Sequence, residues 1–157
     1  MNTVRDYVVM WIDQRGSEVL TVPECHRLLA LAAKNGKIGR LAVRGDDAPI
    51  VVPVNFAVHD RQVIMRLGPG QLAQSAIGSL VAFETDEVDV STGTAWSVLV
   101  RGLATLAEPL DPQQGSGQEA GLPHPLVPVA GTTMVAVRPD VVSGRRFVLQ
   151  PGDESPR

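Results

Sequence analysis

The chain has 157 residues, of which 44% are hydrophobic and 20% are charged, the balance of one globular domain rather than of a disordered or fibrous protein. Its net charge of −3 gives the molecule as a whole no attraction for nucleic acid or for an anionic membrane surface. The single cysteine, Cys25, excludes an intramolecular disulfide and a multi-cysteine metal site, and is consistent with a reducing, cytoplasmic location.

Residues 1–20 form an N-terminal extension that contains one short apolar run. The run Tyr7–Ile12 has six residues and lies between Asp6 and Asp13. This is too short for the core of a signal peptide or for a membrane span. We therefore expect a cytoplasmic protein that does not associate with membranes.

A helix is predicted directly after this extension. Thr21-Val-Pro-Glu24 is a capping box, in which the Thr21 hydroxyl accepts from the N–H of Glu24 and the Glu24 carboxylate accepts from the N–H of Thr21. The helix continues to about Asn35, and Gly36 can take the left-handed conformation that ends it. One face is apolar and is formed by Cys25, Leu28, Leu29, Ala32 and Ala33.

The rest of the chain reads as short apolar strands separated by turns. The predicted strands are Ile38–Val43, Pro49–Val58, Gln62–Arg66, Leu80–Thr85, Thr94–Ala107, Thr133–Val137 and Ser143–Leu149. Gly68-Pro-Gly70 interrupts this series before a short helix over Gln71–Ile77, and Asp86–Asp89 is predicted to be an acidic loop. Glu108–Gly121 is predicted to be a surface excursion, and residues 150–157 a flexible tail.

These elements predict a mainly β domain over residues 21–149. Many short strands, one capped helix and no alternation of strands with helices favour a small antiparallel barrel. The strand Thr94–Ala107 is apolar on both faces around Val98–Val100. We therefore expect one of its faces to pack on the barrel interior and the other on a second subunit.

No catalytic grouping or metal site is predicted. His26, His59 and His124 lack the spacing of metal ligands and are interpreted as ordinary histidines. Cys25 lies on the apolar helix face, where a buried cysteine is favoured over a nucleophile. The acidic residues between Glu84 and Asp89 lack the glycine and the ligand spacing of a calcium loop, so a solvated turn is favoured.

Six segments resemble, in order and spacing, the pyridoxamine 5'-phosphate oxidase-like family of FMN-binding split barrels. They are Glu24–Ala30, Gly39–Val43, Val52–Phe56, Val81–Glu84, Ala95–Val100 and Val142–Phe147. The resemblance implies an antiparallel six-stranded split β-barrel with the capped N-terminal helix and one or two short helices. It also implies a homodimer with a cofactor site at the subunit interface.

The same resemblance assigns eight residues to the cofactor site and leaves the catalytic residues unknown. In the family pattern a strand pair holds the flavin of FMN, and a Trp-Ser strand of the partner subunit completes the pocket. Backbone groups of Val54 and Asn55, on the predicted strand Pro49–Val58, would meet the polar edge of the ring. Arg66 would bind the phosphate, and Arg146 near the C-terminus would approach the site. The eight residues are Val54, Asn55, Arg66, Leu67, Gln71, Trp96, Ser97 and Arg146.

Three positions depart from the family pattern. Leu67 stands where relatives carry Thr, Gln71 where they carry Lys, and Ala136 where an arginine is common. One hydroxyl and one cation for the phosphate are therefore missing. Each lost charge-assisted contact costs about 1.5–3 kcal/mol, or about one to two decades of affinity.

Two functions follow from the resemblance. The first is a flavin-dependent oxidoreductase that uses FMN, or a deazaflavin as in some relatives, on an unidentified small molecule. The second is a degenerate split-barrel dimer without flavin that acts as a binding or regulatory protein; in a variant of this alternative, the pocket holds haem near His59. Synthesis of pyridoxal phosphate itself is not expected, because no second set of phosphate-binding cations is visible.

Overall fold

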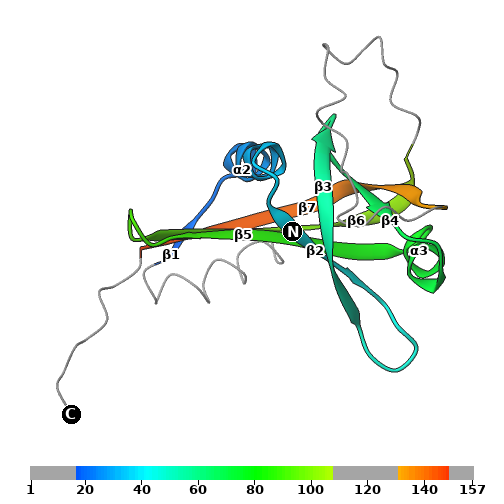
Figure 1. The fold of residues 1–157 in the computed structure, drawn as a ribbon. Coiled ribbons are helices and arrows are strands. Elements are labelled where there is room, and N and C mark those ends of the chain that lie inside the picture. The colour runs from blue at the N-terminus through cyan, green and yellow to red at the C-terminus, as the bar shows by residue number, and fades with distance from the viewer. Residues whose placement is uncertain (1–16, 108–130, 149–157) are drawn as a thin grey trace, which may run out of the picture.

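The structure is a computed structural model that describes residues 17–107 and 131–148 (Figure 1). The run Tyr7–Ile12, the Glu108–Gly121 segment, His124 and the tail from Gln150 lie outside these residues. Among the described residues, neither helix has the length and apolar character that a bilayer span requires.

The described elements follow the predicted order. They are β1 (Ser17–Val19), α2 (Val22–Lys34), β2 (Ile38–Val43), β3 (Ile50–His59), β4 (Gln62–Leu67), α3 (Gln71–Ala76), β5 (Leu80–Asp89), β6 (Thr94–Leu106) and β7 (Thr133–Val148). All strand pairs are antiparallel, in the order β1-β7-β4-β3-β2-β5-β6, and an additional β7–β6 pairing closes the barrel. The predicted six-stranded barrel is confirmed, with β1 as an extra strand.

The long strand β7 connects the two ends of the molecule. Its first half pairs with β4, for example Arg66 with Met134, and its second half pairs with β1, for example Glu18 with Arg146. On its other edge β7 pairs with β6 along nearly its whole length. Residues at the two ends of β7 therefore belong to different ends of the barrel.

The helix α2 begins with the predicted capping box. The backbone N–H of Thr21 donates to Glu24 Oε2 over 3.0 Å, and the N–H of Glu24 donates to the Thr21 hydroxyl over 3.4 Å. The bond from the Thr21 backbone, followed by that from its side chain, lowers the pKa of the Glu24 carboxyl. Gly36 follows the helix with φ of +66°, as predicted for its end.

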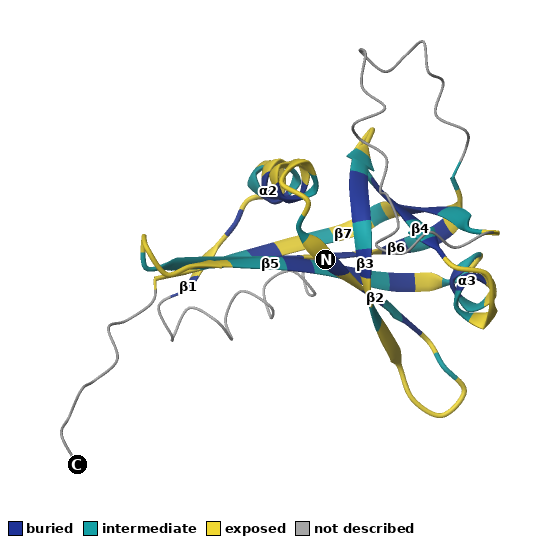
Figure 2. Cartoon of the chain, in the orientation of Figure 1, coloured by how far each residue is buried: buried dark blue, intermediate teal, exposed yellow. Residues whose placement is uncertain are grey.

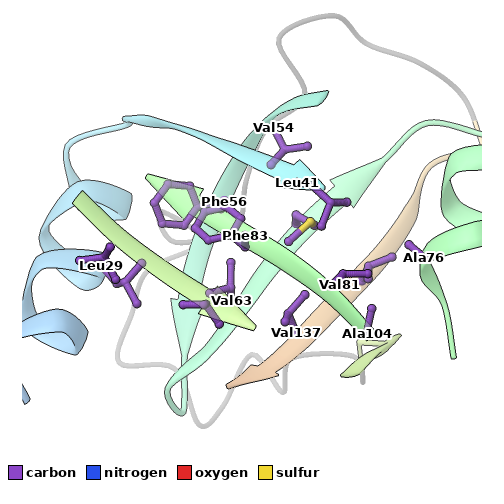
Figure 3. Close-up of a cluster of buried hydrophobic side chains, with 14 of the residues drawn as sticks. Leu29, Leu41, Val54, Phe56, Val63, Ala76, Val81, Phe83, Ala104 and Val137 are labelled. Carbon is purple, nitrogen blue, oxygen red and sulfur yellow. The ribbon is translucent and has the colours of Figure 1, made fainter. Parts of the chain in front are cut away.

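The main hydrophobic core fills the barrel and extends beneath both helices. Figure 3 shows Leu29 of α2 on one side of it, Ala76 of α3 on the other, and the rings of Phe56 and Phe83 between the strands. These two rings meet edge to face, with centroids 4.7 Å apart. In Figure 2 the buried face of α2 points toward the strands, so α2 covers one part of the barrel as the apolar pattern predicts.

Two predicted boundaries are wrong. Asp86–Asp89 is not a loop, because β5 continues to Asp89 and pairs with β6 through Asp89 and Thr94. Its acidic side chains are accommodated by cations on neighbouring elements: Asp86 pairs with Arg40 over 2.8 Å, and Glu87 pairs with Lys37 over 2.7 Å.

The two predicted closing strands are one strand. β7 runs without interruption from Thr133 to Val148, although it contains Pro139. The proline is accommodated at a register shift between Arg101 and Gly102, where Gly102 lies opposite Pro139. A bulge is one of the few places where a strand tolerates proline.

Gly102 allows the backbones of β6 and β7 to approach closely at this bulge. A Cβ atom at this position would lie 1.8 Å from the carbonyl oxygen of Arg138. We predict that Gly102→Ala lowers the free energy of unfolding by about 1–3 kcal/mol, because the strand must move to relieve the overlap. Urea denaturation at fixed protein concentration measures this change.

Gly68→Ala is the matched control for that substitution. A Cβ at Gly68 meets nothing within 4 Å. We expect its stability to be unchanged or slightly higher, because alanine restricts the unfolded chain. Equal stability of the two variants would contradict the close approach of the β6 and β7 backbones at Gly102.

Candidate functional site

Asn55 and Arg66 lie on the outer face of two neighbouring barrel strands. Met65 and Phe56 are paired across β3 and β4, and both point into the core. Since successive side chains on a strand point to opposite faces, Arg66 and Asn55 both point outward from adjoining positions. The structure thus brings together the predicted phosphate-binding arginine and one of the residues predicted to line the ring.

Arg66 has a buried polar atom that lacks a partner. The side chain is half-buried, and its Nε has no hydrogen-bond partner in the structure. Within residues 17–107 and 131–148 it also forms no ion pair. Arg40 and Arg146, by contrast, each contact two carboxylates. Burial of a cationic donor without an acceptor is unfavourable, so an anionic group of a ligand would satisfy this position.

A small apolar surface adjoins Arg66 on the outer face. Ala57, Ile64 and Ala136 form a second buried cluster there, and Met134 packs against it. Ile64 pairs with Ala57 on one side and with Ala136 on the other, and Met134 pairs directly with Arg66. Ala136, where relatives commonly carry an arginine, therefore contributes to an apolar floor beside the guanidinium rather than a second charge.

The other predicted residues near β4 lie as follows. The side chain of Leu67 points into the barrel core, so only its backbone faces a ligand on the outer surface. Gln71 is exposed at the first turn of α3. The side chain of Val54 is also buried in the core. The pairing between β3 and β4 ends at Phe56, and Val54 lies beyond that last paired position.

The predicted Trp-Ser pair is divided between two faces of β6. Trp96 packs against the main core, on the side of the sheet that α2 covers. Ser97 points to the opposite, outer face and is half-buried. Ser97, but not the indole of Trp96, therefore shares an orientation with Asn55 and Arg66.

The two adjacent arginines of β7 are divided in the same way. Arg146 pairs across the strands with Trp96 and contacts Glu18 over 3.1 Å and, at 3.9 Å, Glu24 of α2. It therefore lies on the α2 side, occupied by carboxylates of its own chain. Arg145, which the sequence did not single out, pairs with Ser97 and shares the outer face with it. Alternation along the strand is the signal that distinguishes the two arginines.

Within one chain, the two parts of the predicted site are far apart. Arg66 lies beside Met134 at the start of β7, and Ser97 lies beside Arg145 near its end. The intervening strand would span roughly 36 Å if fully extended, at about 3.3 Å per residue. The strand bends at the bulge, but its two ends remain on different parts of the barrel (Figure 1).

The cysteine and the two described histidines lie on α2 and at the end of β3. Cys25 is fully buried, and burial raises the pKa of its thiol, which disfavours the reactive thiolate. Burial and then the charge of Arg61 lower the pKa of His26. His59 lies at an exposed turn with its Nε2 3.4 Å from Asp60. In the part of the chain that the structure describes, no three His, Cys, Asp or Glu side chains gather as a metal site.

A shallow hollow lies elsewhere on the outer surface and includes none of the eight predicted residues. Its volume is about 460 Å³. It is lined by Leu80, Val81, Ala82, Arg101, Gly102, Asp140 and Val141. Leu80 is 74% exposed, and Val88 on the same strand is 58% exposed. Exposed apolar side chains on β5 to β7 are typical of a surface that contacts another protein.

Comparison with known proteins gives consistent matches. The family described as pyridoxamine 5'-phosphate oxidase matches residues 21–146. The chain is 38% identical, over 116 residues, to the uncharacterized protein Rv0080 of Mycobacterium tuberculosis, and the match covers 70% of this chain and 74% of that protein.

Two solved structures extend the comparison to the fold. The FAD binding protein from Mycobacterium smegmatis is 33% identical, with a TM-score of 0.66, and the match covers 85% of this chain and all (100%) of that one. An FAD-binding protein from Mesorhizobium loti is 22% identical, with a TM-score of 0.62 and coverage of 83% and 96%. The second similarity shows the fold alone.

Proposed function

Because the chain belongs to the pyridoxamine 5'-phosphate oxidase family, we propose that it binds a flavin nucleotide between two copies of itself and acts as an oxidoreductase on a small organic molecule. The observation that carries this proposal is Arg66, whose buried Nε lacks an acceptor on the outer face beside Asn55. A phosphate group of a ligand would supply the acceptor that this Nε lacks.

The residues of this chain would hold different parts of the flavin. Arg66 would bind the phosphate, and backbone groups of Val54 and Asn55 would meet the polar edge of the ring. Ala57 and Ile64 would offer an apolar surface that excludes water. When bound, the flavin would supply the redox chemistry.

FMN is the smallest flavin with a phosphate that Arg66 could bind. The similarity to FAD binding proteins supports FAD as well, since it carries the same ring and a pyrophosphate. A deazaflavin would use the same phosphate contact. Under this proposal all three ligands would use the cation of Arg66, and riboflavin, which has no phosphate, would not.

The homodimer is part of the proposal because one chain separates the two parts of the site. Arg66 on β4 lies beside the start of β7, and Ser97 on β6 lies beside its end. In the proposed dimer, the Ser97 of one subunit would lie against the Arg66 of the other. The exposed apolar residues of β5 and β6, including Leu80 and Leu99, offer a surface for that contact.

The visible absorption spectrum of the purified protein after incubation with FMN or FAD and removal of free ligand tests the flavin proposal. We expect the two visible bands of an oxidised flavin to remain with the protein. A colourless protein that fails to quench the fluorescence of either flavin would support the degenerate dimer instead. Leu67 and Gln71, which add no charge, are the residues that favour that alternative.

A further inference from the structure

An uncharged row of side chains crosses the outer face at the end of the barrel where β1 lies (Figure 1). Val88 of β5 pairs with Ala95 of β6. Phe147 of β7 pairs with Ala95 on one side and with Ser17 of β1 on the other. These side chains point outward, because Trp96, the residue after Ala95, packs against the main core. These four residues, Val88, Ala95, Phe147 and Ser17, form the outer row.

The outer row exposes apolar side chains and is separate from the surface assigned above to the dimer. Val88 is 58% exposed and Phe147 is 39% exposed. Leu80 begins β5, and Val88 lies eight residues further along it, a distance of roughly 26 Å in an extended strand. The hollow beside Leu80 also contains the charged side chains of Arg101 and Asp140, whereas the outer row contains no charge. The two surfaces therefore suit different occupants.

The N-terminal run Tyr7–Ile12 has the composition that the outer row requires. Its six side chains carry no charge, and Asp6 and Asp13 lie on either side of it. Covering an exposed apolar surface with a second apolar surface removes both from water, which is favourable. The flanking carboxylates can remain hydrated while the run itself is covered.

The chain between the run and β1 is long enough to bring the run onto the outer row. Ile12 precedes Ser17 by five residues, which extend over at most about 18 Å. Val88 lies three strands across the sheet from Ser17, or roughly 14 Å at the usual distance between neighbouring strands. Every position of the outer row is therefore within reach of the run.

We propose that Tyr7–Ile12 docks on the outer row of its own chain and covers Val88 and Phe147. The contact joins two uncharged apolar surfaces, so no charged group loses its hydration. The N-terminal segment thereby becomes part of the outer face beside β1. The inference goes beyond the proposed function and does not depend on it, because neither the run nor the outer row contains a residue assigned to the flavin.

Trp11 lies within the run and reports on its surroundings. The chain has two tryptophans, so Trp96→Phe leaves Trp11 as the single emitter. Acrylamide quenching of this full-length protein, without added flavin, is compared with quenching of a synthetic peptide of residues 1–16. Docking shields the indole from solvent, so we expect a quenching constant several times smaller than that of the peptide. A constant equal to that of the peptide would overturn the inference.

Val88→Lys, made in the Trp96→Phe protein, tests whether the outer row is the docking surface. Covering an ammonium group with apolar side chains is unfavourable, so the quenching constant should rise toward the value of the peptide. Phe147→Ala, which adds no charge, should raise it as well, because part of the apolar contact is lost.

Val51→Lys is the matched control for Val88→Lys. Val51 is 59% exposed and lies on β3, which β2 separates from β5. The same substitution at this position should leave the quenching of Trp11 unchanged. Circular dichroism checks that each variant is folded. Equal effects of Val51→Lys and Val88→Lys in folded proteins would contradict docking on the outer row.

A second copy of the chain is the alternative occupant of the outer row, and sedimentation velocity distinguishes the two. Docking within one chain predicts that Val88→Lys exposes Trp11 and leaves the association state of the protein unchanged. A Val88→Lys protein that loses its dimer while Trp11 stays shielded would assign the outer row to the second copy and overturn the inference. Flavin binding is measured separately on the wild type, so that result would leave the proposed function standing.

Discussion

Replacement of Arg66 by alanine should reduce the affinity for FMN and for FAD by about one to two orders of magnitude. The guanidinium is half-buried, its Nε has no acceptor in the structure, and its neighbours Ile64 and Met134 are apolar. A bound phosphate would therefore lose a charge-assisted contact that no adjacent side chain can replace. Isothermal titration calorimetry with each flavin measures the change.

Two further variants make the Arg66 prediction specific. Arg44→Ala removes an exposed arginine that follows β2 and should leave flavin affinity unchanged. Arg66→Lys keeps the charge but loses the planar, bidentate geometry, so its affinity should be intermediate. If Arg66→Ala bound FMN as tightly as the wild type, the phosphate would have to lie elsewhere.

Replacement of Leu29 by alanine should lower the free energy of unfolding by about 2–5 kcal/mol, more than any other substitution proposed for stability. Leu29 is 1% exposed and belongs to the core on which α2 packs. Truncation would remove its contacts and leave a cavity between the helix and the barrel. Chemical denaturation followed by circular dichroism, at one protein concentration, measures the difference.

The same helix provides the control. Leu31 lies two residues further along α2 and is 41% exposed. Leu31→Ala removes the same atoms with the same change in helix propensity, but it leaves no buried cavity. We expect a change of less than about 1 kcal/mol. Similar losses for both variants would contradict the orientation of α2.

The sequence was sufficient to predict those parts of the fold that depend on residues close together in the chain. The capping box at Thr21 and Glu24, the left-handed Gly36 and the apolar face of α2 all act within a few residues of chain, and the structure confirms them. The barrel followed from the order of short strands. Its closure through β6 and β7 fits the long apolar strand that was predicted from Thr94 onward.

The sequence was insufficient to predict where β5 and β7 begin and end, because these bounds depend on pairing between distant segments. Asp86 and Glu87 appear loop-forming in isolation, but Arg40 and Lys37 of distant segments neutralise them and β5 continues. The closing segment was predicted as two strands, Thr133–Val137 and Ser143–Leu149, but the bulge opposite Gly102 accommodates Pro139 and β7 continues through it.

The candidate site shows the same limit. The resemblance selects Arg146 and groups Trp96 with Ser97, whereas strand alternation places the members of each adjacent pair on opposite faces. Which face carries Ser97 depends on the register of β6 with β5 and β7, and that register is set by contacts remote in sequence. Arg145 could be distinguished from Arg146 only once this register was known.

The most direct test of the central claim, a flavin held between two subunits by Arg66, is sedimentation velocity of the flavin-loaded protein followed at the visible flavin band. The proposal predicts that the flavin sediments with a dimer, at two flavins per dimer, and that Arg66→Ala leaves the dimer intact but carries less flavin at the same total flavin concentration. A flavin that sediments with a monomer, or with the Arg66→Ala dimer at the same stoichiometry and affinity, would contradict it.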